Sequence, residues 1–173
     1  VVQALEGPLF TEVTVKYDLE HMVRYRIYNV TNVEMSSVVE IEALVGPLGR
    51  FKTVVSKFSS SLKTDHQFFY DQNGYQRIEA TTDPSLGVGC NFHPMASRAW
   101  LVDADACSAT DDRISSMALI TSDVRGVTSL ASGELEIMWH RRSPHEELRG
   151  NDQSSIRSSV WLAFGNTNHL EAT

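Results

Sequence analysis

The sequence predicts an all-β fold, a single antiparallel β-sandwich domain over residues 1–173. In most segments apolar residues alternate with polar ones, which is the period of a strand. Turn residues separate these segments at the short intervals typical of sandwiches and barrels. No segment carries a helical apolar stripe, and 42% apolar residues in 173 are enough for one core.

The first half of the chain predicts four strands and a hairpin. EVTVKYDL (12–19) and VRYRIYNV (23–30) both alternate, and the short Glu20-His21 link makes them a hairpin. SSVVEIEALVGPL (36–48) predicts a strand that ends at Gly-Pro, and FKTVVSKFS (51–59) predicts another. FFYDQNGYQRIEA (68–80) predicts a hairpin with a tight Asn73-Gly74 turn, since both residues tolerate positive φ.

The second half predicts further strands, which brings the total to roughly eight to ten. They are SRAWLVDA (97–104), ISSMALITS (114–122), SGELEIMWH (132–140) and SIRSSVWLAFG (155–165). In the third of these, one face should hold Leu135, Ile137 and Trp139, while Glu134, Glu136 and Met138 face water. The three tryptophans lie in strand patterns and are predicted to fill the core: Trp100, Trp139 and Trp161.

The charge of the chain argues against two classes of partner. The formal net charge is −7 and the isoelectric point is about 5.3, whereas binders of nucleic acid or anionic membranes usually carry a basic surface. No run is apolar and long enough to span a bilayer. The chain starts Val-Val, without Met or a signal-peptide pattern, so we expect it to start inside a longer precursor.

No catalytic centre or metal site is predicted from residue spacing. The six histidines are scattered, and none pairs at a spacing such as HxH or HxxxH. The acidic stretch from Asp103 to Ile114 lacks the turn glycine and closing glutamate of an EF-hand. There is no GxSxG motif. Glu134 and Glu136 would lie about 6.6 Å apart along a strand, but such a pair is typical of a solvated sheet face.

Two modifications depend on the compartment in which the protein resides. The two cysteines, Cys90 and Cys107, form no CxxC motif and leave two alternatives open, one disulfide or two buried thiols. Asn29-Val30-Thr31 is an acceptor for a glycan on Asn29 if the chain is secreted.

Five stretches of the sequence, taken together and in order, carry a family resemblance. They are Gly7-Pro8-Leu9 with Thr11-Glu12-Val13, VGPLG (45–49), SLKTDHQFFYDQNG (61–74), GCNFHPMASR (89–98) and GELEIMWHRR (133–142). Over about residues 1–150 they resemble glycoside hydrolase family 38, the zinc-dependent α-mannosidases. Within the third stretch, Phe69 and Tyr70 depart from the family pattern, while Phe68, Asp71, Asn73 and Gly74 match it.

The resemblance implies an enzyme that removes α-linked mannose from N-glycans with retention of configuration. In the family, the zinc, its ligands and the catalytic carboxylates lie on an N-terminal catalytic domain. The HxDxGW motif of that domain does not occur here. The chain is therefore expected to be a supersandwich-like β domain from the C-terminal region, with no catalytic residue and no zinc ligand of its own.

One part of the family's substrate site is expected in this chain. After the two arginines, family members carry an acidic loop that ends in Arg-Gly and touches substrate in the catalytic cleft, and Glu146 to Gly150 match it. The resemblance implies that Arg149 donates forked hydrogen bonds to sugar hydroxyls or carboxylates and that Gly150 lets the backbone approach the ligand closely. The alternative is a surface ion pair of Arg149 with Glu146 or Glu147. Residues 151–154 depart from the family's continuation.

Arg141 and Arg142 are expected at the domain interface, where they would brace this loop against the catalytic domain. The alternative is that they are exposed charges at a strand end.

The expected function is thus an accessory domain of a retaining α-mannosidase that lends a loop to the glycan cleft. Its partners would be the N-terminal catalytic domain and mannose-containing glycans. The resemblance places it in the secretory pathway, with the lysosome as the expected compartment, a setting compatible with a Cys90–Cys107 bridge. The alternative is a free-standing carbohydrate-binding or adhesion module, which needs an exposed aromatic platform.

Overall fold

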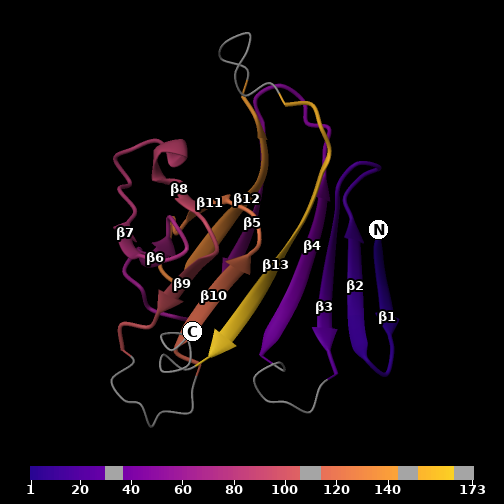
Figure 1. Cartoon of the computed structure of the whole chain (residues 1–173), viewed down its shortest axis with the longest axis horizontal. Coiled ribbons are helices and arrows are strands. Elements are labelled where there is room, and N and C mark those ends of the chain that lie inside the picture. The colour runs from indigo at the N-terminus through magenta and orange to yellow at the C-terminus, as the bar shows by residue number, and fades with distance from the viewer. Residues whose placement is uncertain (30–36, 106–113, 144–151, 166–173) are drawn as a thin grey trace. The chain divides into compact units, whose positions relative to one another are not determined.

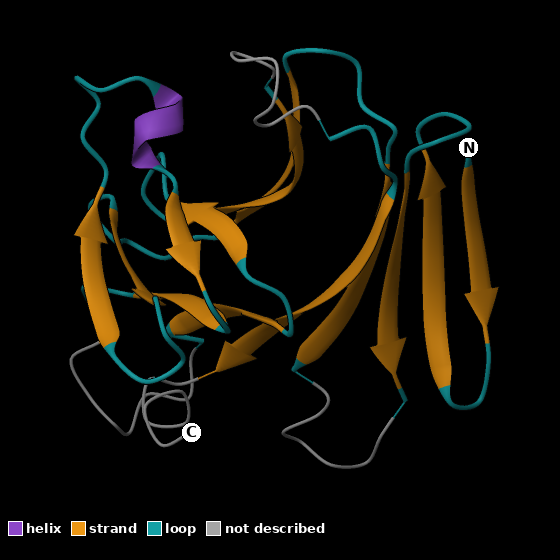
Figure 2. Ribbon diagram, turned by 45° about the horizontal axis from the view of Figure 1, so that its top comes forward, coloured by secondary structure: helices purple, strands orange, loops and turns teal. Residues whose placement is uncertain are grey.

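The computed structural model of the chain describes residues 1–29, 37–105, 114–143 and 152–165. These residues form thirteen strands in two sheets and one 3-10 turn, Val88–Asn91 (Figures 1 and 2). The architecture confirms the predicted all-β, antiparallel sandwich class. Contacts divide the chain into two compact units, Val1–Ser56 with Met138–Val160, and Lys57–Ile137 with Trp161–Thr173. The expectation of a single domain stays a prediction.

The first unit is built on an antiparallel meander. It contains β1 (Val2–Glu6), β2 (Phe10–Lys16), β3 (Met22–Tyr28) and β4 (Val38–Val45), hydrogen-bonded in that order, with the first part of β13 (Ile156–Gly165), which pairs with β4. β2 and β3 form the predicted hairpin, with Val13 opposite Tyr25 and Val15 opposite Val23. The unit also holds the first part of β5 (Lys52–Ser59) and the second part of β12 (Glu134–Arg142).

Strand alternation gives the sheet of the first unit one apolar face and one charged face. On β4, Ile41, Ala43 and Val45 are buried, and on β3 Val23 is buried with them. The intervening positions include Arg24 and Arg26 on β3 and Glu40 and Glu42 on β4. The period-two pattern read from the sequence therefore assigns both faces of this sheet.

The second unit has two layers of strands. One layer has the order β10 (Ser116–Thr121), β9 (Arg98–Val102), β6 (Gln67–Asp71) and β7 (Arg77–Thr81). The other contains β8 (His93–Met95), β11 (Arg125–Thr128) and the first part of β12. The buried side chains of this unit include Phe68, Met95, Leu101, Met117, Leu119, Val127, Leu135 and Ile137.

Three details of the predicted elements were wrong. Trp161 is 36% exposed, while Trp100 and Trp139 are buried as predicted. The β6–β7 hairpin exists, but residues 72–76 connect its strands, and only Gly74 has positive φ. Asn73 instead accepts the N–H groups of the two residues after Gly74 through its side-chain oxygen. Asn73 therefore acts as a side-chain acceptor in this turn.

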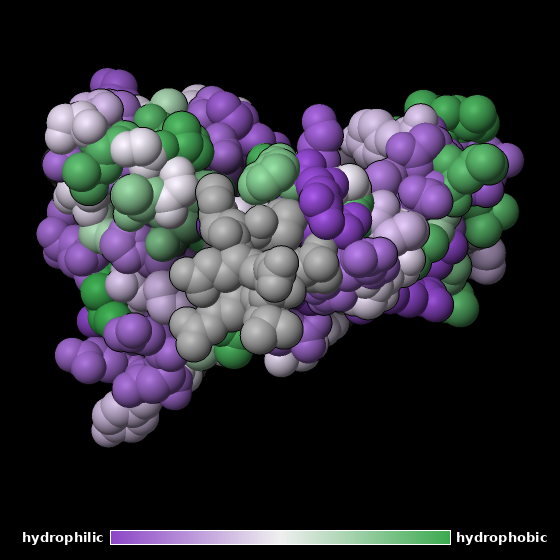
Figure 3. Space-filling view, turned by 90° about the horizontal axis from the view of Figure 1, so that it is seen from above, coloured by the Kyte–Doolittle hydropathy of each residue, from purple (hydrophilic) through white to green (hydrophobic). Residues whose placement is uncertain are grey.

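The strand count was too low because three short strands have weak patterns. β1, β8 and β11 lie outside the predicted strands. β1 is an edge strand whose residues are all exposed. Several apolar residues in and beside β1 are exposed: Val1, Val2, Leu5 and Leu9. Apolar surface is visible at the right of Figure 3. In the part of the chain that the structure describes, no helix has the length and hydropathy to cross a bilayer.

Candidate functional site

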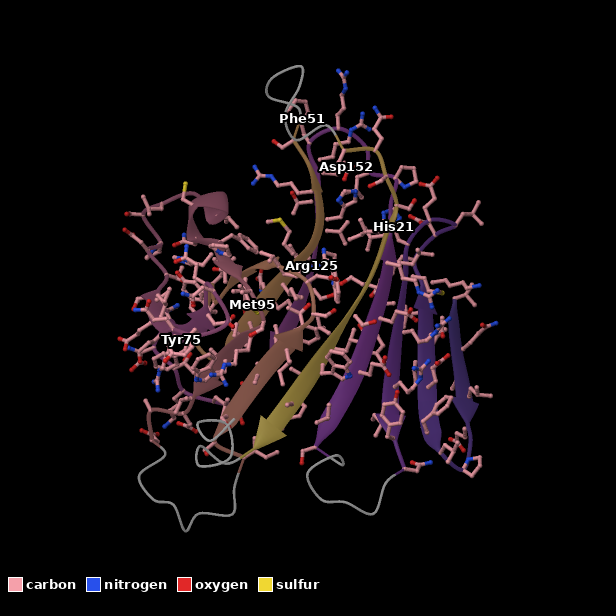
Figure 4. All side chains as sticks on the ribbon, viewed as in Figure 1. His21, Phe51, Tyr75, Met95, Arg125 and Asp152 are labelled. Carbon is pink, nitrogen blue, oxygen red and sulfur yellow. The ribbon has the colours of Figure 1, made fainter. Side chains whose placement is uncertain are left out.

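The residues on either side of the predicted substrate loop make contacts that the structure describes. Arg149 and Gly150, with Glu146 and Glu147, lie outside the described residues. The segment 144–151 leaves from the end of β12 and returns through Asp152 to β13, and both flanks contact the connection between β4 and β5. We call this group the loop base: Gly46, Leu48, His140, Arg142, Asp152 and Ser154. Figure 4 labels Asp152, and Phe51 at the same end of the strands in that view.

Gly46 lets the β4–β5 connection lie directly against the returning chain. Its φ is +117°, and a Cβ there would lie 2.7 Å from the Ser154 carbonyl oxygen and 2.9 Å from Cα of Ser155. Both distances are shorter than real Cβ contacts, so glycine is required at this position for two independent reasons. The VGPLG stretch thereby packs against Ser154 and Ser155, in the described chain that follows residue 151.

A buried histidine holds the same carbonyl. His140 Nε2 lies 3.0 Å from the Ser154 oxygen. Because a carbonyl can only accept, Nε2 carries the proton and donates it. On the other side of the peptide, the Asp152 carboxylate accepts the Ser154 N–H at 2.8 Å, and this bond holds the pKa of Asp152 below its usual value. Ser154 is therefore held through both backbone groups.

The two predicted interface arginines have different environments. Arg142 Nη1 donates to the Leu48 carbonyl at 2.7 Å, so its guanidinium ties the outgoing strand to the VGPLG stretch. Arg141 is exposed. Contact of either residue with another domain stays a prediction.

A second glycine joins two other stretches of the family resemblance. Gly133 has φ +75°, and a Cβ there would lie 2.6 Å from the Leu62 carbonyl oxygen. Its N–H donates to Thr64 Oγ1 at 3.0 Å, and its carbonyl accepts the N–H of Ser60 at 2.9 Å. The start of the GELE strand is thus closely packed against the SLKT stretch, whose Leu and Thr match the family pattern.

A buried aspartate joins a third pair of stretches. The Asp71 carboxylate accepts the backbone N–H groups of Ser97 and Arg98 at 2.8 and 2.9 Å, and it accepts the Ser97 hydroxyl. Burial acts to raise the pKa of Asp71, but these hydrogen bonds outweigh it and lower the pKa. The Asp of the FYD stretch therefore shapes the turn that carries Ser97-Arg98.

The charged face of the first unit carries a network of ion pairs across β2, β3, β4 and β13. We call it the charge ladder, and its members are Glu12, Arg24, Arg26, Glu40, Glu42 and Arg157. Arg26 bridges Glu12 at 2.7 Å and Glu40 at 3.0 Å. The Arg157 hydrogen bond is the main cause that lowers the pKa of Glu42. The Glu of the TEV stretch belongs to this ladder.

The predicted solvated pair on β12 is only partly solvated. Leu135, Ile137 and Trp139 fill one face as expected, but Glu136 on the other face is buried too. Lys57 Nζ bridges Glu134 at 3.0 Å and Glu136 at 3.3 Å, and its hydrogen bond to Glu134 raises the pKa of Lys57. The pair is thus one side of a three-residue ion cluster.

The remaining predicted sites are only partly described. Asn29 is exposed, and its side-chain Nδ2 donates to the Gly7 carbonyl at 2.8 Å, while Thr31 lies outside the described residues. Cys90 is exposed and Cys107 lies outside the described residues, so the bridge stays a prediction. Within the described ranges, no group of three or more His, Cys, Asp or Glu side chains is placed to hold a metal ion.

Sequence reasoning found the parts of the loop base but not their contacts. VGPLG (45–49) and HRR (140–142) both belong to the family resemblance, yet they are separated by about half of the chain and nothing in the spacing pairs them. Ser154 was missed altogether because it acts through its backbone, which leaves no trace in residue type.

Comparison with known proteins fits this set of paired stretches. The family "Glycosyl hydrolases family 38 C-terminal domain" matches residues 1–149. The chain is 30% identical to "Alpha-mannosidase 2" of Homo sapiens, over 88% of this chain and 12% of that protein. It is 32% identical to "Epididymis-specific alpha-mannosidase" of Sus scrofa, over 73% of this chain and 13% of that protein. It is 30% identical to "Lysosomal alpha-mannosidase" of Bos taurus, over 72% of this chain and 13% of that protein.

The chain thus spans little more than a tenth of the length of the curated relatives it matches. The family model that it matches describes the C-terminal domain of the family. Within the matched residues, the contacts at Asp71 and Gly133 join stretches that are separate in the sequence. The chain belongs to glycosyl hydrolase family 38, as a C-terminal domain of that family.

Proposed function

We propose that this chain is the accessory β domain of a zinc-dependent retaining α-mannosidase that removes α-linked mannose from N-glycans. Its role is to support the catalytic domain and to present the segment 144–151, with Arg149 and Gly150, to the mannose-binding cleft. It contributes no catalytic residue of its own.

The observation that carries this proposal is the loop base, whose residues come before and after the segment 144–151 in the sequence. A loop that contacts substrate works only if its ends are fixed, because small displacements of binding groups weaken a site strongly. Here Arg142, before the segment, donates to Leu48 in the β4–β5 connection, and Ser154, after it, packs closely against Gly46 of the same connection. The bond of His140 to the Ser154 carbonyl joins the two flanks to each other.

Two exposed apolar features favour a large partner, which we assign to the catalytic domain of the same protein. β1 is an apolar edge strand without the lysines or prolines that usually protect such edges. Phe51 is exposed in the β4–β5 connection with φ +58°, an unusual conformation for a bulky residue. Both features suit surfaces that are covered in the assembled enzyme.

The positions of the tryptophans argue against the alternative, a free-standing sugar-binding module. Trp100 and Trp139 are buried, and the partly exposed Trp161 does not by itself form a flat aromatic platform.

Zinc, compartment and glycosylation follow from the same proposal. The proposal places the zinc on the catalytic domain, and no step here depends on it. One matched relative is named as lysosomal, in keeping with a secretory-pathway protein. A glycan on Asn29 would be compatible with the local structure, since the amide retains one N–H for the Gly7 carbonyl.

The first test is Arg149→Ala in the full-length enzyme. We expect kcat/KM for an α-mannoside to fall about 10²-fold, since a forked charged hydrogen bond contributes about 1.5–3 kcal/mol. Lys63→Ala removes a surface cation from an exposed ion pair and should leave the rate unchanged. Equal rates for wild type and Arg149→Ala would remove the substrate role of the loop.

A further inference from the structure

The first unit contains a pocket that the proposed function does not use. It opens beside the β2–β3 turn, where Figure 4 labels His21, and has a volume of about 380 Å³. Ligand pockets span about 300–1,000 Å³, so this one has the size for a small group such as one sugar ring. Its lining residues are Tyr17, Asp18, His21, Met22, Val23, Leu44, Val45, Val54, Val55, Ser56 and Trp139.

The polar wall of the pocket is organised before any ligand binds. Asp18 Oδ1 accepts the backbone N–H groups of Glu20 and His21 at 2.8 and 2.7 Å. His21 Nδ1 lies 2.8 Å from each carboxylate oxygen of Asp18, so it donates its proton there. The opposite ring nitrogen, Nε2, has no partner among the described residues and remains able to bind a ligand hydroxyl.

Two further groups are held in place around the same space. Trp139 Nε1 donates to Ser56 Oγ at 2.7 Å, which leaves the hydroxyl proton of Ser56 for another acceptor. Tyr17 is 68% exposed and lines the pocket, and its backbone N–H donates to the His21 carbonyl at 3.0 Å. An exposed aromatic ring at this position is a suitable surface for the C–H face of a sugar.

The chemistry of the lining selects a class of ligand. Among the described residues that line it there is one carboxylate, one imidazole and no lysine or arginine, which disfavours an anion. The rest of the lining is largely aliphatic, from Met22 and Leu44 to Val54 and Val55. A ligand that fits has hydroxyls on one side and an apolar face on the other, as a pyranose does.

We propose that this pocket is a glycan-binding subsite that holds one pyranose ring of a mannose-containing glycan. Asp18 and His21 bind its hydroxyls, and Tyr17 and the aliphatic floor contact its C–H face. The identity of the sugar rests on the proposed function, whereas the pocket itself is formed by this chain alone.

The test uses the full-length enzyme with its catalytic cleft filled by a saturating active-site inhibitor. The probe is methyl α-mannopyranoside, titrated by saturation-transfer difference NMR. We expect a saturable signal, and Tyr17→Ala and His21→Ala should each raise its Kd at least about tenfold, the effect of losing one good polar or stacking contact. The control is Tyr75→Ala, which removes a 94% exposed tyrosine on the β6–β7 connection and should leave the Kd unchanged.

A wild-type enzyme without a saturable signal would overturn the inference, as would a signal that the two pocket variants leave unchanged. Circular dichroism confirms that each variant is folded. If the inhibitor-free enzyme releases mannose but the pocket signal is absent, only the subsite falls. If the enzyme releases no mannose from any α-mannoside, the proposed function falls, and the titration still reports on the pocket.

Discussion

At the scale of single residues, two glycines have almost the same backbone angle but different surroundings. Gly133 has φ +75° and Gly74 has φ +74°. A Cβ on Gly133 would lie within 3 Å of two carbonyl oxygens, those of Ser60 and Leu62, whereas a Cβ on Gly74 would meet nothing within 4 Å. The pair therefore separates the effect of conformation from the effect of packing.

We predict that Gly133→Ala destabilises the protein more than Gly74→Ala. Both variants lose about 1–2 kcal/mol because an L-residue is strained at positive φ. Gly133→Ala should lose about 1–3 kcal/mol more, since backbone atoms cannot easily move away from the new methyl group. Urea unfolding of the two variants measures the difference. Equal losses would mean that the SLKT stretch shifts freely and does not fix the start of β12.

The Asp71 carboxylate makes stability depend on pH in a defined direction. Its pKa is lowered in the folded protein, so its stabilisation is present above the unfolded value of about 3.9 and is lost as pH falls through the lower, folded pKa. Asp71→Asn should be less stable than wild type by about 1–3 kcal/mol at pH 7. The difference in free energy of unfolding between the two proteins should become smaller as the pH is lowered below about 4. Urea unfolding at a series of pH values would measure it. A gap that stayed constant with pH would show that the charge of Asp71 contributes nothing.

At the scale of elements, the charge ladder explains why the outer face of the first sheet tolerates so many ionised groups. Arg24, Arg26 and their glutamates are only 15–25% exposed. Each arginine lies between two strands and pairs with a carboxylate on each side. Water weakens the attraction between the charges of such a network less than it weakens an isolated surface ion pair.

We predict a coupling of about 1 kcal/mol between Glu12 and Arg26, measured by a double-mutant cycle of Glu12→Gln and Arg26→Met. The matched control is the cycle for Lys63 and Asp105, whose side chains are 73% and 55% exposed and should couple close to zero. Repeating both cycles in 1 M salt should leave most of the ladder coupling, because water and ions reach it poorly. Equal couplings for the two pairs would mean that partial burial has no influence here.

The elements also show what sequence pattern can and cannot predict. Strands with clear alternation, such as β2, β3 and β12, were predicted because burial of one face imposes a period of two. β1, β8 and β11 were missed because a short or edge strand is held by backbone hydrogen bonds, which residue type does not record. Trp161 had the same pattern as Trp139 but lies partly exposed, since alternation gives two faces and does not say which one is covered.

At the scale of the whole molecule, the predicted family stretches become contacts between distant parts of each unit. The loop base joins VGPLG, the end of β12 and Ser154, and only the first two could be named from the sequence. The family resemblance suggested that these stretches matter, and the structure supplies the physical reason. Side-chain pattern predicted the strands, while the connections depend on backbone groups of Gly46, Leu48 and Ser154.

We predict that the loop base and Arg149 act as one unit in the full-length enzyme. His140→Phe removes the donor to the Ser154 carbonyl and should lower kcat/KM for an α-mannoside, because the segment above it loses its fixed end. In combination with Arg149→Ala, it should lower kcat/KM little further, because the position of the loop matters only while Arg149 is there to bind substrate. The control is Lys63→Ala, which should change neither single nor double variant. Fully additive losses would instead indicate that His140 stabilises the domain without positioning Arg149, and thermal unfolding of the same variants would then show a matching fall in Tm.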